Sequence, residues 1–438
     1  MNMVEGQNPV KTLLDNRKNG EYGGIPSYCC ANELVIEAIL KKNLYTQAPV
    51  LIEATSNQVN QLGGYTGMRP ADFRDMVYRI ADAIGFDRDR IILGGDHLGP
   101  LPWQGLHADV AMSRAKEMVR EYVLAGYKKI HLDTSMHLGS DKFENFGAHV
   151  VAERGVELYM TCEEAYQELK QKNPNEIHPV FVVGSEVPIP GGTGEEKVDE
   201  LVVTTPEGFL ETVNAYKDVL EKHGLSEAWE HICAIVVQPG VEFGNYGIHC
   251  YNREEAASLV KCVSGLGGLV MEGHSTDYQT PTHLREMVTD GIAIIKVGPA
   301  LTYALREALF AMSYLEKEII ENECDRANFM ETLEAAMLAN PKNWEKFYKG
   351  SEWEKRFQRR FSISDRSRYY FAVPEVKNAM AKLFKNFNST SIPMWVLHQY
   401  MPVQYERIGE GKLAVDAKEI VIDFIADVVD GYNYAVRK

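Results

Sequence analysis

Acidic and imidazole side chains occur together at two points of the chain, in a combination suited to metal-assisted proton transfer. Asp96 and His97 follow the apolar run Ile91–Gly95, and His274 follows the apolar run Leu269–Glu272. Imidazole nitrogens bind zinc and similar divalent ions, while a carboxylate can move a proton on a substrate that such an ion holds. We therefore predict Asp96 as a proton carrier and His97 and His274 as metal ligands. Hydrogen-bonded histidines without a ligand are the alternative.

Further acids follow other apolar runs. Asp133 ends the run Lys129–Leu132, and we assign it to catalysis together with Glu186. Glu242 is predicted as an oxygen ligand of the metal, although either glutamate could instead orient a ligand or lie solvated on a loop. His131 precedes Asp133 by two residues and shares its face of the strand, but a packed barrel residue is the favoured interpretation there.

Two glycine turns and one arginine cluster are suited to anions. Gly298 lies in a turn that opens a helical segment, where backbone amides receive phosphate, and Gly191–Gly192 offer a second close backbone approach. Arg366 belongs to a group of four arginines between residues 359 and 368, and guanidinium forks suit phosphate or carboxylate. A salt bridge that anchors the C-terminal part is the favoured alternative for this group. The predicted substrate contacts are Glu53, Gln238, Ser275, Asp277, Gly191, Gly192, Gly298 and Arg366.

These residues need a scaffold that brings distant strand ends together. Short apolar runs alternate with segments of helical character such as Pro70–Ile84 and Asp109–Ala125, which is the pattern of an α/β protein with a closed parallel (β/α)8 TIM barrel. In that fold the loops after the strands build the active site. The eight predicted strands are Ile25–Cys29, Val50–Ala54, Ile91–Gly95, Lys129–Leu132, Val180–Gly184, Cys233–Val237, Leu269–Glu272 and Ile292–Val297.

The chain is longer than a barrel requires. We predict a barrel over residues 1–318, preceded by a short helix at residues 8–19 that covers its bottom, and a helical extension packed on it over residues 319–438. The loop Pro188–Glu200 is long and rich in glycine and acids. Such a loop is predicted to be a lid or a binding loop.

Charge and composition narrow the class of protein. The formal net charge of −16 argues against binding to nucleic acid or to an anionic membrane. Seven cysteines without a CxxC pair indicate reduced thiols rather than a disulfide framework. The first ten residues lack the apolar segment of a signal peptide, and no apolar run is long enough to span a membrane. These features predict a cytoplasmic, soluble protein, while a homo-oligomer stays open.

Seven blocks of sequence resemble one known family. The chain resembles the so-called non-catalytic subunit family of class II D-tagatose-1,6-bisphosphate aldolase, formerly labelled tagatose-6-phosphate kinase. The resemblance implies a barrel with a helical extension, a role in ketohexose metabolism and a separate catalytic class II aldolase subunit as partner. The blocks are GGDHLGP (94–100), KKIHLD (128–133), GSEVPIPGG (184–192), VVQPGVEF (236–243), GHSTDYQTP (273–281), KVGPALTYALREALF (296–310) and SDRSRYY (364–370).

The same blocks are distantly similar to the catalytic class II aldolases, which cleave ketose bisphosphates with a divalent metal. By that resemblance Asp96 is the proton carrier, His97 and His274 are ligands, and Glu186 precedes a mobile Gly-Gly loop. Two departures stand out. An acid, Glu242, replaces the middle histidine ligand, and Asp277 replaces the serine that receives substrate phosphate, which its charge would repel.

Three functions follow from these observations. The family resemblance favours an accessory subunit that supports retro-aldol chemistry on a tagatose- or fructose-type ketose or ketose phosphate. The retained acid and histidines favour a stand-alone metal enzyme, with Zn²⁺ or Mn²⁺, that inverts C4 of a ketohexose or its 6-phosphate by breaking and remaking the C3–C4 bond. A metal-free sugar-binding scaffold is the weaker third interpretation.

Overall fold

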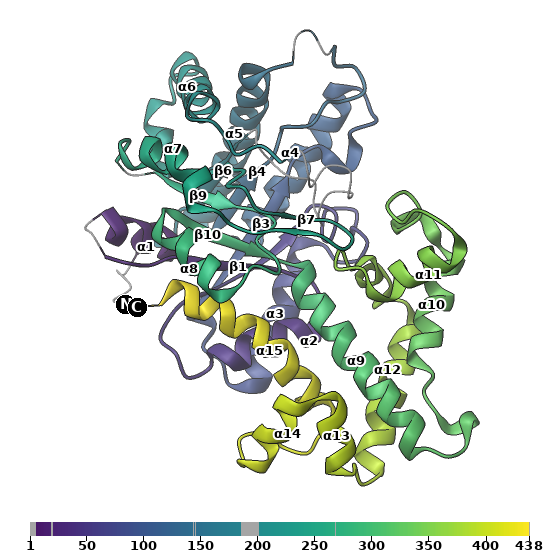
Figure 1. The fold of residues 1–438 in the computed structure, drawn as a ribbon. Coiled ribbons are helices and arrows are strands. Elements are labelled where there is room, and N and C mark those ends of the chain that lie inside the picture. Colours follow the sequence, from purple (N-terminus) through teal and green to yellow (C-terminus); the bar gives the residue numbers. More distant parts are fainter. Residues whose placement is uncertain are drawn as a thin grey trace.

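Eight parallel strands close a barrel (Figure 1), as the sequence predicts. The structure is a computed structural model that describes residues 6–18, 21–142, 144, 146–184, 201–267 and 269–437. All eight predicted apolar runs lie in barrel strands, which succeed one another around the barrel as β1-β2-β3-β4-β5-β6-β9-β10. Their bounds are β1 Ile25–Cys29, β2 Val50–Thr55, β3 Ile91–Leu98, β4 Lys129–Leu132, β5 Val180–Val183, β6 Ile232–Val237, β9 Val270–Gly273 and β10 Ile292–Val297.

Helices alternate with the strands and cover the outside of the barrel (Figure 1). Both α6 (Pro206–Lys222) and α8 (Pro281–Thr289) begin at the proline of a Thr-Pro pair, because the threonine hydroxyl accepts an amide hydrogen of the first turn and proline fits that turn. A small antiparallel pair, β7 (Glu242–Phe243) with β8 (Ile248–His249), follows β6. The barrel helices are α2 Glu33–Asn43, α3 Pro70–Ile84, α4 Ala108–Leu124, α5 Ala148–Lys172, α6 Pro206–Lys222, α7 Arg253–Ser264 and α8 Pro281–Thr289.

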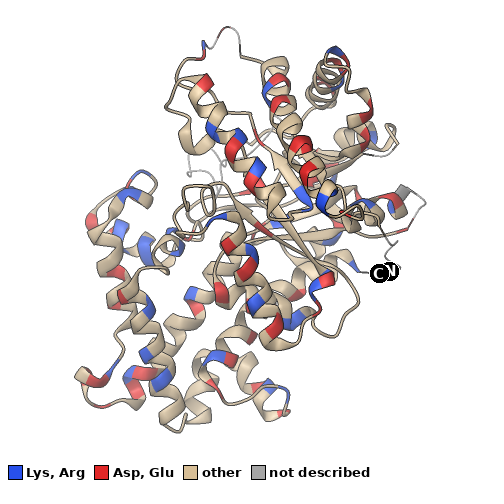
Figure 2. Cartoon of the chain, turned by 180° about the vertical axis from the view of Figure 1, so that it is seen from behind, with Lys and Arg blue, Asp and Glu red and all other residues tan. Residues whose placement is uncertain are grey.

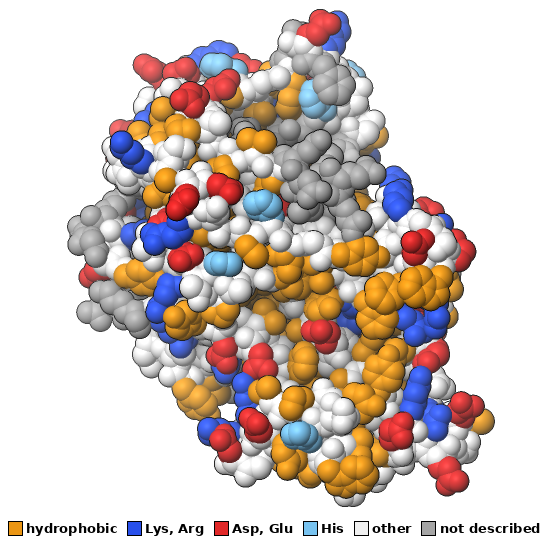
Figure 3. Space-filling model, in the orientation of Figure 1, with side chains coloured by type: hydrophobic (Ala, Val, Ile, Leu, Met, Phe, Trp, Pro, Cys, Tyr) orange, Lys and Arg blue, Asp and Glu red, His pale blue; other side chains and the backbone are white. Residues whose placement is uncertain are grey.

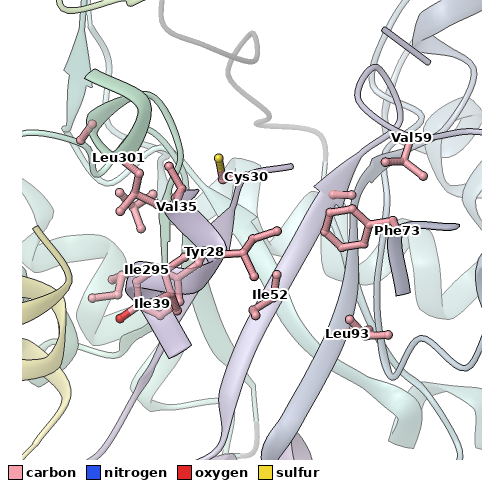
Figure 4. Close-up of a cluster of buried hydrophobic side chains, with 14 of the residues drawn as sticks. Tyr28, Cys30, Val35, Ile39, Ile52, Val59, Phe73, Leu93, Ile295 and Leu301 are labelled. Carbon is pink, nitrogen blue, oxygen red and sulfur yellow. The ribbon is translucent and has the colours of Figure 1, made fainter. Parts of the chain in front are cut away.

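The outward faces of the strands pack on these helices and form the main core. Figure 4 shows Tyr28 and Ile52 of the first two strands beside Val35 and Ile39 of α2, and all four side chains are at most 2% exposed. Because side chains of a strand alternate between its two faces, the remaining positions point into the barrel. That alternation decides which polar residues reach the interior.

A short helix closes the bottom of the barrel, as predicted. Helix α1 (Pro9–Lys18) buries Val10 and Leu14 against inward-facing residues near the strand beginnings, such as Ile25 and Ile92. The Asn8 side chain donates to backbone carbonyls of Lys128 and His178, just before β4 and β5. The helix thus seals the end of the barrel opposite the strand carboxyl ends.

Replacing Leu14 by alanine is expected to lower the free energy of unfolding by about 2–3 kcal/mol. Leu14 is 3% exposed and lies between α1 and the barrel interior, so truncation leaves a void there. Urea denaturation measures the loss. The neighbouring Leu13, which is only partly buried, is the matched control and should cost less when it is truncated. Equal losses of stability at the two positions would contradict the placement of the Leu14 side chain inside the barrel.

The C-terminal helices form a mass beside the barrel, and the last one returns to it. Helix α15 packs against α2, α8 and α9, where it covers β1 (Figure 1). The Tyr432 hydroxyl donates to the Thr276 carbonyl at 2.8 Å, at the end of β9. The division at residue 318 stays a prediction, but the extension includes part of the barrel's own outer layer. The helices are α9 Pro299–Ile319, α10 Phe329–Ala339, α11 Glu352–Phe361, α12 Pro374–Ser389, α13 Met394–Tyr400, α14 Pro402–Gly409 and α15 Ala417–Val436.

The surface mixes charge with apolar side chains. Acidic and basic residues are interspersed on the outer helices (Figure 2), and hydrophobic side chains gather over the C-terminal helices (Figure 3), where Trp353 and Trp395 are exposed. Within the described residues, no helix is both long and apolar enough to cross a membrane. All seven cysteines are described, and all are free thiols.

Candidate functional site

The inward-facing side chains change from apolar to charged along the barrel axis. Beginning at α1, the lower interior is apolar, with Leu51, Ile92 and Ile294 among its residues. Two residues further along the same strands stand Glu53, Gly94 and Lys296, with Lys129 and Glu272 beside them. A Cβ on Gly94 would come within 2.5 Å of a Glu53 oxygen, so glycine there leaves the space that this glutamate fills. The strand period of two therefore directs charged groups into the interior.

Lysine and glutamate form a fully buried ionic network below the rim. Lys129 Nζ lies 2.9 Å from Glu53 Oε1 and 2.6 Å from Glu272 Oε2, and all three side chains are 0% exposed. Lys296 Nζ contacts Glu53 and lies 2.7 Å from Asp96 Oδ1. Since buried charges need partners, these two ammonium groups and three carboxylates stabilise one another as a unit.

Three histidine rings meet just above this network. The ring centroids of His97, His131 and His274 lie 4.8 to 5.1 Å apart. A carboxylate holds one nitrogen of each ring. The pairs are His97 Nδ1 with Asp133 at 2.8 Å, His131 Nδ1 with Asp96 at 2.9 Å, and His274 Nε2 with Glu272 at 2.9 Å.

Local backbone distortion places Asp96 and His97 together. The pairing of β3 with β4 shifts register between Gly95 and Leu98, and His97 has a φ of +46°. Such a bulge with a left-handed residue turns both side chains toward the rim instead of to opposite faces, at a cost of about 1–3 kcal/mol. Ser275, directly after His274, has a φ of +53°, so the backbone is strained at both strand ends that carry these histidines.

Charges in this cluster set the protonation states. Burial alone would raise the pKa of Asp96, but His97 and Lys296 hold it well below its usual range, so Asp96 is ionised. Burial alone would raise the pKa of Asp133, but its hydrogen bond to His97 and the charges of His97 and His131 together lower it to about 2. Burial lowers the pKa of His274 to about 3, which leaves a neutral imidazole. The site thus combines a carboxylate base with an imidazole able to bind a metal.

The residues present fit a divalent metal ion. Ligand atoms of Asp96, His131, Glu272 and His274 all lie within 4.8 Å of one another. His97 is not in this group, and its role as a metal ligand stays a prediction. A carboxylate on one nitrogen of an imidazole is the arrangement that orients metal-binding histidines. The other nitrogen of His131 is buried and has no hydrogen-bond partner among the described residues. A second group, Cys29, Glu53 and Asp96, fits less well, because the Lys296 ammonium already supplies a positive charge there.

The cluster opens into a cavity of about 650 Å³. The barrel rim contributes Asp96, His97, His274 and Lys296 to its wall. Ser275, Asp277 and Gly298, which were predicted as substrate contacts, also line it. The C-terminal extension supplies another part of the wall with Arg368, Tyr369 and Phe371. A bound molecule would therefore touch both parts of the chain.

Asp277 occupies the amino end of α9. Its Oδ1 accepts hydrogen bonds from the amides of Gly298 at 3.0 Å and Ala300 at 2.8 Å. They belong to the turn at Gly298, whose backbone amides we predicted to bind an anion. Burial raises the pKa of Asp277 to about 6, although the two amides favour its ionised form. The chain's own carboxylate thus fills this cradle.

Other predicted residues lie around the cluster. Glu53 belongs to the ionic network below it. Gln238 accepts hydrogen bonds from the amides of Gly240 and Val241 and so orders the turn after β6.

Glu242 accepts a hydrogen bond from the Phe243 amide, and burial raises its pKa to about 7. It is not among the four residues whose ligand atoms lie together. Its role as a metal ligand stays a prediction. Glu186, Gly191, Gly192 and the loop Pro188–Glu200 lie outside the described residues.

Several members of the cluster were not predicted. Lys129, Glu272, Lys296 and Cys29 were read as parts of strands, and a packed role was favoured for His131. Their spacing carried a signal, because Lys129, His131 and Asp133 alternate along one strand, as do Glu272 and His274 along another. Charged residues at alternate positions inside an apolar run indicate a polar barrel interior.

Comparison with known proteins gives consistent matches over almost the whole chain. Residues 10–437 match the model of a family described as "D-tagatose-1,6-bisphosphate aldolase subunit GatZ/KbaZ-like". The D-tagatose-1,6-bisphosphate aldolase subunit GatZ of Escherichia coli O6:K15:H31 is 44% identical over 425 residues, which cover 97% of this chain and 99% of that protein. A solved structure from Sinorhizobium meliloti 1021, named a probable tagatose 6 phosphate kinase, is 42% identical with a TM-score of 0.84 and covers 94% of this chain and 100% of that one.

Proposed function

This chain belongs to the GatZ/KbaZ-like family of D-tagatose-1,6-bisphosphate aldolase subunits, and we propose that its rim cluster performs retro-aldol chemistry on ketohexoses of the tagatose and fructose type. The observation that carries the proposal is the set of three histidines, each held by a carboxylate, beside the ionised Asp96 in a cavity. A surface that only bound another subunit would need no such arrangement.

Asp96 is the proposed proton carrier. It accepts the proton of the C4 hydroxyl while the C3–C4 bond breaks, so that C4 becomes an aldehyde and the bond's electrons remain on C3. Lys296, at 2.7 Å, keeps this carboxylate ionised and in place. Asp133 orients His97 by its hydrogen bond, and Glu186 is proposed as a further acid. Return of the proton to the oxygen at C4 completes the reverse step.

His97, His131 and His274 would hold a divalent ion, for which Zn²⁺ and Mn²⁺ are the proposed candidates. Glu242 is proposed as an additional oxygen ligand. When bound, the ion supplies Lewis-acid polarisation of the C2 carbonyl and C3 hydroxyl of the sugar. Asp133, Asp96 and Glu272 fix the orientation of the three rings.

The position of Asp277 favours one form of this chemistry, a 4-epimerase. A bisphosphate has a phosphate at each end, and the amide cradle at the start of α9 is filled by Asp277. A second phosphate would meet a carboxylate there instead of free amides. A ketohexose or its 6-phosphate avoids this repulsion, and re-addition after rotation of the aldehyde would invert C4.

The relatives' description as aldolase subunits supports a second role. We propose that this chain also associates with a separate catalytic class II aldolase subunit, in the cytoplasm. Both roles can reside in one chain, since the rim cluster and an intersubunit surface need not overlap.

The purified chain alone is expected to interconvert C4 epimers in a metal-dependent way. Fructose 6-phosphate, tagatose 6-phosphate, both 1,6-bisphosphates and the free ketoses are incubated with Mn²⁺, with Zn²⁺ or with a chelator, and products are resolved by chromatography. Interconversion that the chelator abolishes supports the proposal. Activity that appears only after a catalytic aldolase subunit is added would reject the stand-alone epimerase and support the accessory role. Sugar binding without turnover, in protein that contains no metal by mass spectrometry, would reject both catalytic roles and support a metal-free sugar-binding scaffold.

A further inference from the structure

The cavity wall contributed by the extension carries unusual charge. A 3₁₀ turn, η8 (Arg366–Tyr370), precedes α12 and places Arg368 and Tyr369 in the wall that faces the barrel rim. Arg366 lies behind them, 4% exposed, with its guanidinium 3.4 Å from the centre of the Phe347 ring. Neither arginine takes part in the retro-aldol step described above.

Both guanidinium groups lack an acidic partner. Among the described residues, no carboxylate oxygen lies within 4.0 Å of Arg366 or Arg368. Arg368 instead donates to the carbonyls of Ser364 and Asp365 and to the Tyr369 hydroxyl. Nε of Arg366 is buried without a hydrogen-bond partner among those residues.

Two other buried arginines, one on α9 and one on α11, show the contrast. Arg306 lies 2.9 Å from Asp365, and Arg359 lies 2.6 Å from Glu334. An internal anchor therefore explains those two residues, but it does not explain Arg366 and Arg368. A largely buried cation with no carboxylate in direct contact is costly, and a cavity beside it allows a ligand to supply the negative charge.

Phenol groups complete the wall. The Tyr369 hydroxyl lies 3.0 Å from Arg368, and its ring packs edge-on against Tyr65 from the loop after β2, at 4.8 Å between centroids. Both tyrosines line the cavity. Burial alone would raise the pKa of Tyr369, but the two arginines lower it below its usual value. The wall thus concentrates positive potential and hydroxyl donors.

We propose that Arg368 and Tyr369, with Arg366 behind them, form the subsite for the terminal phosphate of a sugar phosphate whose carbon chain reaches the rim cluster. This deepens and rests on the proposed function, since it places the charged end of that substrate opposite Asp96. A phosphate dianion suits two adjacent guanidinium groups better than a carboxylate does, because it brings more charge and three acceptor oxygens. With the amide cradle filled by Asp277, the guanidinium group of Arg368 in the cavity wall is the proposed contact for this phosphate.

Binding of inorganic phosphate to the full chain tests the subsite without any turnover. Titration calorimetry of the wild type should show saturable binding of phosphate and much weaker binding of acetate. Arg368→Met is expected to weaken phosphate binding by roughly 10- to 100-fold. Arg356→Met, on the exposed face of α11, is the matched control and should bind as the wild type does. Circular dichroism melts establish that each variant is folded.

Two conservative variants keep the test decisive if Arg368→Met does not fold. Arg368→Lys keeps the charge but loses the fork, and Tyr369→Phe loses one donor; each should weaken phosphate binding by about 3- to 10-fold. Absence of phosphate binding to the wild type, or unchanged affinity in the folded variants, would overturn the subsite. Phosphate binding that depends on Arg368 in a chain without epimerase activity would retain the subsite and reject the proposed function.

Discussion

Replacing Asp96 by asparagine is expected to lower kcat/KM for C4 epimerisation by about 10³-fold, within the range that general acid–base groups contribute. The introduced amide can accept a hydrogen bond from His131 or Lys296, but it cannot take the proton of the C4 hydroxyl. The loss should appear mainly in kcat, because the change removes the proposed proton carrier rather than a binding contact. Steady-state kinetics on the preferred ketose of the wild type measures it.

Asp109→Asn is the matched control for this variant. The Asp109 side chain is 91% exposed, and His107 at 3.5 Å is its ion-pair contact, so the same chemical change should leave the rate as it is. Metal content must be measured in both proteins, since Asp96 also orients His131. If Asp96→Asn keeps its metal and its full rate, another residue carries the proton.

Replacing Lys129 by methionine is expected to lower the free energy of unfolding by about 3–5 kcal/mol. The side chain is 0% exposed between Glu53 and Glu272, and its removal leaves two buried carboxylates with Lys296 as the remaining ammonium in the network. Methionine nearly preserves the volume, so the loss reports unbalanced charge and not a cavity. Guanidinium denaturation followed by circular dichroism gives the value.

Lys116→Met provides the comparison for a surface ion pair. Lys116 lies 2.6 Å from Glu157 with both side chains about two-fifths exposed, and its loss should cost at most about 1 kcal/mol. Adding Glu272→Gln to Lys129→Met should restore part of the stability, because it removes one of the unbalanced charges. An equal cost for the two lysine variants, or no recovery in the double variant, would refute the network as a coupled unit.

The fold was largely predictable because its signal is local. Each barrel strand is a short apolar run between helical segments, and α3 begins and ends where the periodicity of Pro70–Ile84 predicts. The histidines at the ends of β3 and β9 were found for the same reason, since residues that follow parallel strands share one rim.

The remaining members of the cluster could not be predicted from the sequence, because closure of the barrel is what brings them together. Lys129 and Glu272 sit inside strands, and a sequence does not show which strand face becomes the interior until all eight strands are in place. The bulge at His97 and the pairing of Asp277 with the start of α9 also arise only in the folded chain. Arg366 and Arg368 lie in a turn of five residues, which gives no periodicity from which to predict which of the two lines the cavity.

The return of α15 to the barrel has a consequence for synthesis. On the ribosome, β1 and α2 are synthesised long before α15, the helix that covers them. Until residues 417–436 have been translated, part of that apolar surface stays uncovered and is a natural binding site for chaperones. The barrel wall at β1 is therefore sealed only after α15 has been synthesised.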